Sequence, residues 1–117
     1  FYGPLYHSNH DAVLLTIMKG RDYGLPDYNT VRVNMGLEEK TSFESVNPAL
    51  ALSNPTLIDA FRNVHKGNLS TVDMFVGGMM ESTPDGPGEL FSHILYDQFI
   101  RLRDGDRFWF ENTANGL

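Results

Sequence analysis

Cysteine is absent from this sequence of 117 residues, and basic residues are few. The lack of thiols excludes disulfides and thiolate metal sites within these residues. Nine Lys and Arg stand against fifteen Asp and Glu, which gives a net charge of −6 at pH 7. A nucleic-acid-binding protein needs a basic surface to neutralise phosphates, so the composition predicts no nucleic-acid partner.

Long apolar runs are also missing. No run approaches the roughly 20 apolar residues of a membrane-spanning helix, and the start of the chain lacks the pattern of a secretory signal. Enough apolar residues are present for a core, because 41% of the chain is hydrophobic and eight residues are Phe. The sequence starts without Met and stops at Leu117 without a capping residue or tail. We therefore expect residues 1–117 to be part of a larger domain, truncated at both ends.

Apolar residues recur at helical spacing and strand patterns are weak, so the sequence predicts a mainly α fold. Capping residues and glycines mark where the helices start and stop. The first helix has few polar residues after its first turn, which predicts burial on most of its sides. The predicted helices are residues 8–20, residues 26–36, residues 54–67, a shorter segment from 70 to 77–78, and a last helix of about four turns from residue 88.

Three segments between or inside these helices are interpreted as structural. Residues 37–53 are polar and are predicted to form a surface connection with one short helical turn. Gly77 and Gly78 lack the strand-then-helix context of a phosphate-binding loop, so they are predicted to break a helix. The pair Arg21 and Asp22 can either hold an anionic group or satisfy backbone groups at a buried corner, and the spacing favours the corner.

The four histidines offer little chemistry. His7 and His10 share one helical face and can offer two ligands to a metal, but no third ligand and no H-E-x-x-H motif accompany them. His65 lies in the last turn of a predicted helix, where a cation is favourable, and His93 lies off an apolar stripe. Serine hydrolase chemistry has no support either, because no G-x-S-x-G motif is present. These residues predict no catalytic group and no metal site.

Two further motifs leave alternatives open. Asp104, Asp106 and Glu111 fill too few of the alternating positions of a calcium loop, and an Arg/Asp corner that clamps the last helix to the aromatic residues 108–110 is the preferred interpretation. The triplet Asn68-Leu69-Ser70 is a sequon. It would accept a glycan if this part of the chain faces the secretory lumen.

Longer motifs carry a family resemblance. They read G-R-D-Y-G-L-P-D-Y-N at 20–29, V-D-M-F-V-G-G-M-M-E-S at 72–82 and L-Y-D-Q-F-I-R-L-R-D-G-D-R-F-W-F-E-N at 95–112. In order and spacing they resemble the animal haem peroxidase superfamily. The forms D-Y-N-T-V-R, G-G-M-M-E-S and W-F-E-N-T-A-N-G-L are most similar to the peroxidase-like ectodomain of dual oxidases. The resemblance implies the C-terminal part of the helical animal haem peroxidase fold.

The same resemblance implies a parent protein and its setting. The parent would be a membrane NADPH oxidase that makes hydrogen peroxide, with this domain on the extracellular or lumenal side of the plasma membrane. Expected partners are the remainder of the same peroxidase domain and the membrane-embedded oxidase portion, and haem is the expected cofactor of the complete domain. The alternatives are a secreted haem peroxidase of the same superfamily and a haemless adhesion or interaction module.

Residue by residue, the resemblance assigns a supporting role to the first helix. The family's distal histidine, catalytic arginine and proximal haem-ligating histidine all precede the G-R-D motif, so none is expected here. In the family this helix has an Asn that bonds the proximal histidine and, three residues later, an Arg that pairs with a haem propionate. Thr16 and Lys19 stand at those positions, which puts the redox function in doubt. Leu15 and Ala12 match positions that line the haem pocket.

Overall fold

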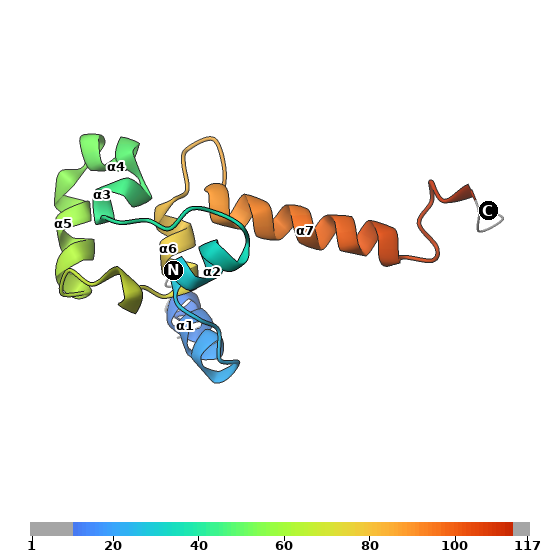
Figure 1. Ribbon diagram of the computed structural model, residues 1–117, viewed down its shortest axis with the longest axis horizontal. Helices are drawn as coiled ribbons and strands as arrows, with labels where there is room; N and C mark the ends of the chain where they lie inside the picture. Colours follow the sequence, from blue (N-terminus) through green and yellow to red (C-terminus); the bar gives the residue numbers. More distant parts are fainter. Residues whose placement is uncertain (1–10, 114–117) are drawn as a thin grey trace, which may run out of the picture.

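The computed structural model describes residues 11–113, which form helices and no strand. The mainly α prediction is thereby confirmed. Helices α2, α3, α4, α5 and α6 gather into one cluster, while α1 and most of α7 lie apart from it (Figure 1). The elements are α1 (Ala12–Asp22), α2 (Tyr28–Asn34), α3 (Phe43–Val46), α4 (Pro48–Ser53), α5 (Pro55–Val64), the 3₁₀ turn η1 (Leu69–Thr71), α6 (Met74–Met80) and α7 (Glu89–Gly105).

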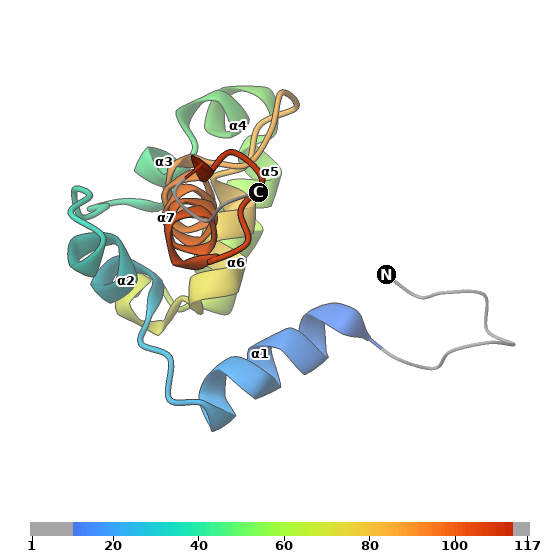
Figure 2. The same cartoon turned by 90° about the vertical axis from the view of Figure 1, so that its right-hand side faces the viewer.

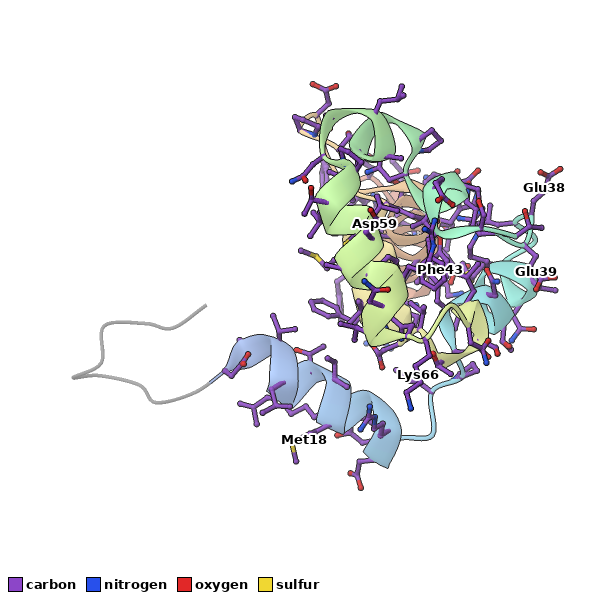
Figure 3. The ribbon with its side chains drawn as sticks, turned by 90° about the vertical axis from the view of Figure 1, so that its left-hand side faces the viewer. Met18, Glu38, Glu39, Phe43, Asp59 and Lys66 are labelled. Atoms are coloured by element: carbon purple, nitrogen blue, oxygen red, sulfur yellow. The ribbon has the colours of Figure 1, made fainter. Side chains whose placement is uncertain are left out.

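The core lies where α2, α3, α5, α6 and the first turn of α7 meet. Phe43 and Phe61 pack edge to face with their ring centroids 5.1 Å apart, a favourable geometry for aromatic rings. Phe43 lies behind α5 in the interior of the cluster (Figure 3). The buried apolar residues are Tyr28, Phe43, Val46, Ile58, Phe61, Val72 and Leu90.

Residues 37–53 form more structure than the sequence predicted. They contain two helices, α3 and α4, where one surface turn was expected, and Phe43 and Val46 are core residues. Ser42 caps α3 through a reciprocal bond with Ser45, and Asn47 caps α4 by accepting from the Leu50 N–H at 3.0 Å. The prediction was wrong because closely spaced capping residues stabilise short helices, so a polar composition does not exclude them.

Helix α6 runs through the glycine pair that was predicted to break it. Gly77 and Gly78 lie inside the helix. Both positions require glycine, because neighbouring side chains occupy the space where a Cβ would stand. A Cβ on Gly77 would lie 2.3 Å from Cδ2 of Tyr28, and one on Gly78 would lie 2.2 Å from Cε1 of Phe91. The pair therefore allows α2 and α7 to approach α6 closely.

Helix α1 begins after Asp11, whose side chain accepts from the backbone N–H groups of residues 13 and 14. The helix continues past Gly20, so the predicted stop there was wrong; Gly24, at φ 69°, ends it instead, and the Leu25 N–H reaches back to the Gly20 carbonyl at 2.9 Å. Burial on most sides is also wrong. Gly20 is its buried residue, and α1 extends away from the other helices (Figure 2).

Helix α7 starts in the core and ends in solvent. Leu90 is fully buried, whereas Phe99 and Leu102, on later turns of the same apolar stripe, are about two-thirds exposed. The radius of gyration of 17.8 Å exceeds the about 13 Å expected for a compact domain near this size. Among residues 11–113, no helix combines the length and the hydropathy that a membrane span requires.

Candidate functional site

The four residues assigned to a cofactor lie on one face of α1. Ala12, Leu15, Thr16 and Lys19 are spaced at i, i+3, i+4 and i+7, which places their side chains above one another along the helix. All four are exposed in the described part of the chain, and Leu15 retains 41% of its accessible surface. The face therefore offers a small residue, an aliphatic residue, a hydroxyl and a cation to whatever covers it.

The Thr16 hydroxyl is available to a neighbouring group only as a hydrogen-bond acceptor. Its Oγ1 donates to the Ala12 carbonyl within the helix at 2.8 Å, which uses its single proton. The lone pairs of Oγ1 remain available, so the side chain can act toward a neighbour only as an acceptor. Thr16 and Lys19 also border a cleft of about 170 Å³ between α1 and the start of α6, next to Met74 and Phe75.

The other groups considered from sequence lie elsewhere. Arg21 and Asp22 are exposed and form no ion pair with each other or with another described residue, so a buried corner there is wrong. The corner is held by backbone bonds around Gly24, which need no side chain. Met18 points away from the helical cluster (Figure 3). His7 and His10 fall outside the described residues.

The two described histidines have structural positions. His65 caps the end of α5, and its ring contacts the rings of Phe43 and Phe61. Burial lowers the pKa of His65, so its neutral form is favoured, contrary to the cation expected at this helix end. His93 is exposed, and its Nδ1 lies 3.0 Å from the Glu89 carbonyl oxygen. Across residues 11–113, no three His, Asp or Glu side chains gather in a way that could hold a metal ion.

The Arg/Asp corner after α7 is looser than expected. Arg101 pairs with Asp97 along the helix at 2.8 Å, and Arg103 pairs with the adjacent Asp104 at 2.8 Å. The Asp106 carboxylate accepts from the backbone N–H of Phe108 at 2.8 Å. The first two contacts lie within α7 and the third shapes the turn after it; apart from the half-buried Asp97, these charged residues are exposed.

The most buried polar side chains of the described residues form an ionic network that joins α2, α6 and α7. Arg32 is 1% exposed, and its Nη1 binds the carboxylate of Glu81, which is equally enclosed. Its Nη2 binds Glu89 at 2.6 Å, and its Nε donates to the Glu38 carbonyl at 2.8 Å. Tyr28 donates its hydroxyl proton to the same Glu81 oxygen that Arg32 binds. Every donor thus has a charged or carbonyl acceptor.

Electrostatics in this network favour one protonation state. Burial raises the pKa of the Tyr28 phenol well above its ordinary value, and the bond to Glu81 raises it further. The hydrogen bond from Arg32 lowers the pKa of the Glu89 carboxyl. The phenol therefore stays neutral and the Glu89 carboxylate stays ionised beside the Arg32 guanidinium over the ordinary pH range.

Glu81 also organises the start of α7. Its Oε2 accepts from the Leu90 N–H at 2.9 Å, which replaces the cap that the N-terminal residue Gly88 cannot provide. A carboxylate at the N-terminus of a helix also interacts favourably with the positive end of the helix dipole. Gly88 must lack a side chain, because a Cβ there would lie 2.3 Å from Cβ of Glu81.

The sequence places Arg32 beside the apolar face of α2 without indicating its partner. Its spacing of i+4 from the buried Tyr28 was the available signal, because a cation on a core-facing stripe requires a carboxylate from elsewhere in the fold. Nothing in the sequence indicates that Glu81 is this partner, since it stands 49 residues away.

Comparison with known proteins decides the family. A model of the family described as animal haem peroxidase matches residues 1–117. The chain belongs to the animal haem peroxidase family. A solved relative, peroxidase A from Dictyostelium discoideum, superposes with a TM-score of 0.79 at 28% identity, covering 98% of this chain and 22% of that one. The helices above are therefore part of the helical peroxidase fold.

Among curated proteins, this family member is similar to dual oxidases. It is 47% identical to human dual oxidase 1 over 115 residues and 46% identical to the dual oxidase of Drosophila melanogaster over 116 residues. The match to dual oxidase 1 of Caenorhabditis elegans is also 46%. These alignments cover 98–99% of the chain but only 7–8% of each relative. The chain thus spans only a small part of the length of the dual oxidases that it matches.

Proposed function

We propose that this chain is a segment of the extracellular peroxidase-homology domain of a plasma-membrane dual oxidase, an oxidase that reduces oxygen to hydrogen peroxide with electrons from NADPH. Identity of 46–47% to dual oxidases along 98–99% of the chain carries this proposal. The partners are the remainder of the same domain and the membrane-embedded oxidase portion. Such a domain either consumes peroxide in a peroxidase reaction or serves as a docking ectodomain.

The α1 face supports a place beside haem in the complete domain. Ala12 and Leu15 present small and aliphatic surface, which suits the edge of a macrocycle, and Lys19 offers a cation to a carboxylate such as a propionate. By the family resemblance the iron-ligating histidine precedes the G-R-D motif, so the fit of this face concerns the periphery of the group. Haem, when bound, would supply oxidation chemistry with peroxide.

Thr16 contributes through the acceptor character of its hydroxyl. A haem-ligating imidazole usually donates its second N–H to a protein acceptor, which fixes the ring orientation and raises its basicity. The lone pairs of Thr16 Oγ1 suit this role, because its proton is already donated to the Ala12 carbonyl. The side chain is shorter than the family's Asn, so we expect a weaker bond and a higher reduction potential.

The exposed apolar faces support assembly with the rest of the domain. On α1, Leu14 and Met18 are 53% and 55% exposed, and the outer half of α7 shows the same pattern. Patches of this kind on a soluble protein mark interaction surfaces. The remainder of the domain is the nearest surface that could cover them.

Expression of the complete ectodomain tests haem binding. We expect a Soret band and peroxide-dependent oxidation of a chromogenic substrate. Lys19→Ala should weaken haem affinity by about tenfold, the value of one charge-assisted bond. Arg21→Ala is the matched control, because Arg21 is a second exposed cation of the same helix that is not assigned to haem. Equal losses in the two variants would contradict the assigned face.

Restoring the family residues gives a second test of the same helix. The double variant Thr16→Asn, Lys19→Arg should bind haem more tightly and shift the reduction potential downward. Unchanged affinity and potential would argue against this placement of α1. A complete domain that binds no haem would instead favour the haemless interaction module, and a parent without membrane segments would favour the secreted peroxidase.

A further inference from the structure

The turn after α5 presents an asparagine to solvent. Lys66 and Gly67 adopt positive φ values of 50° and 72°, which reverses the chain at the end of the helix. Asn68 follows in an extended conformation with an exposed side chain. Figure 3 shows the neighbouring Lys66 at the outer edge of this turn. The triplet Asn68-Leu69-Ser70 therefore lies on an accessible reverse turn.

The side chains of the triplet are already arranged around the amide of Asn68. Its Oδ1 accepts from the backbone N–H of Ser70 at 3.0 Å and from the Ser70 hydroxyl at 2.6 Å. Its Nδ2 forms no hydrogen bond with another described residue. The carbonyl side of the amide is thus occupied by the sequon serine, and the residue as a whole is exposed.

Space for a sugar adjoins the triplet. Asn68 and Ser70 line a cleft of about 600 Å³ between η1 and the outer face of α2. Thr30, Asn34 and Lys40 line the same cleft and bring hydroxyl, amide and ammonium groups. An open cleft with these polar groups in its lining accommodates a hydrated carbohydrate without burying an unpaired polar group.

We propose that Asn68 carries an N-linked glycan, an inference that rests on the proposed extracellular position of the domain. Nδ2 of Asn68 attacks the anomeric carbon of the first N-acetylglucosamine of a lipid-diphosphate-linked oligosaccharide in the secretory lumen. The new N–C bond forms as the C–O bond to the diphosphate breaks; the diphosphate leaves with the electron pair, and Nδ2 loses one proton. The Ser70 hydroxyl is required for recognition of the acceptor.

The full-length protein produced in animal cells provides the test. Peptides that contain Asn68 are analysed by mass spectrometry after treatment with peptide N-glycosidase in ¹⁸O-labelled water. We expect conversion of Asn68 to a labelled Asp in the parent and in Ser70→Thr. Conversion should disappear in Ser70→Ala, which keeps the acceptor Asn, while Asn63→Gln, outside any sequon, should leave it unchanged.

A reporter separates this inference from the proposed location. Glu111→Asn creates a second sequon with Asn112 and Thr113, by one substitution, in an exposed segment that does not line this cleft. A glycan on the reporter without one on Asn68 would overturn the inference and leave the extracellular assignment standing. Absence of both would overturn the inference and the location together. Glycans on both sites would support the two proposals.

Discussion

The most informative perturbation is the removal of one charge from the buried network by Glu81→Gln. The substitution preserves the shape of the side chain, so its effect reports on charge and hydrogen bonding rather than on packing. All three partners of the carboxylate are donors: the Tyr28 hydroxyl, the Arg32 guanidinium and the Leu90 N–H. A glutamine must therefore direct its own NH₂ group at another donor, whichever way the amide is turned.

The size of the loss follows from burial. Breaking a buried ion pair by changing one partner costs about 3–5 kcal/mol, because the remaining charge is left without compensation. Arg32 would keep its bond to Glu89, whose side chain is 53% exposed, so we expect the lower end of this range. A loss of about 3 kcal/mol corresponds to a change of roughly 150-fold in the folding equilibrium.

Urea unfolding of the complete domain, followed by helical circular dichroism, measures this loss. Glu44→Gln is the matched control, because Glu44 also pairs with an arginine, Arg62, but at the surface. Exposed pairs contribute less than about 1 kcal/mol, so the control should remain close to the parent. Similar losses in the two variants would refute the reasoning, since burial would then make no difference.

Three shorter predictions concern the same cluster. Gly77→Ala should destabilise the fold by about 1–3 kcal/mol in thermal unfolding, because its Cβ would meet the Tyr28 ring. Gly105→Ala is the control and should leave the stability unchanged or raise it, because no neighbouring atom lies within 4 Å of its Cβ. Because the folded pKa of Tyr28 is raised, the stability that its protonated form contributes is present below the unfolded value of about 10 and is lost at higher pH. Phenolate absorbance from Tyr28 should therefore appear together with unfolding. Tyr28→Phe should remove this pH-dependent part of the stability, and it also leaves Glu81 with one hydrogen-bond donor fewer. Because the pKa of His65 is lowered in the folded state, acid should destabilise the fold as pH falls through the unfolded value of about 6.5. His65→Gln should reduce the difference between the free energies of unfolding measured at pH 7.5 and pH 5. An unchanged difference would contradict this assignment.

Local sequence signals predicted the helices whose ends have strong caps. Asn54 followed by Pro55 marked the start of α5, and the Leu57 N–H does bind the Asn54 side chain at 3.2 Å. Gly36 marked the end of α2 in the same way, at φ 78°. These signals are reliable because a cap and a positive φ act within one turn of the chain and need no distant partner.

The failures share a physical cause as well. Gly20 and Gly77 were interpreted by backbone preference alone, yet both lie in helices, and Tyr28 on another helix explains Gly77. Likewise, the partner of Arg32 could not be predicted from neighbours in the sequence. The α1 face was predicted as a set from family resemblance and shares one side of the helix, but its ligand remains a proposal.

The ionic network also sets an order for assembly during synthesis. Arg32 precedes its partners Glu81 and Glu89 by 49 and 57 residues. At a ribosomal rate of about 5–20 residues per second, several seconds separate the emergence of the cation from that of its carboxylates. Throughout that interval Arg32 must stay hydrated, because an unpaired guanidinium is too costly to bury. We therefore expect α2 to remain solvent-exposed in the nascent chain until Glu81 and Glu89 have been synthesised.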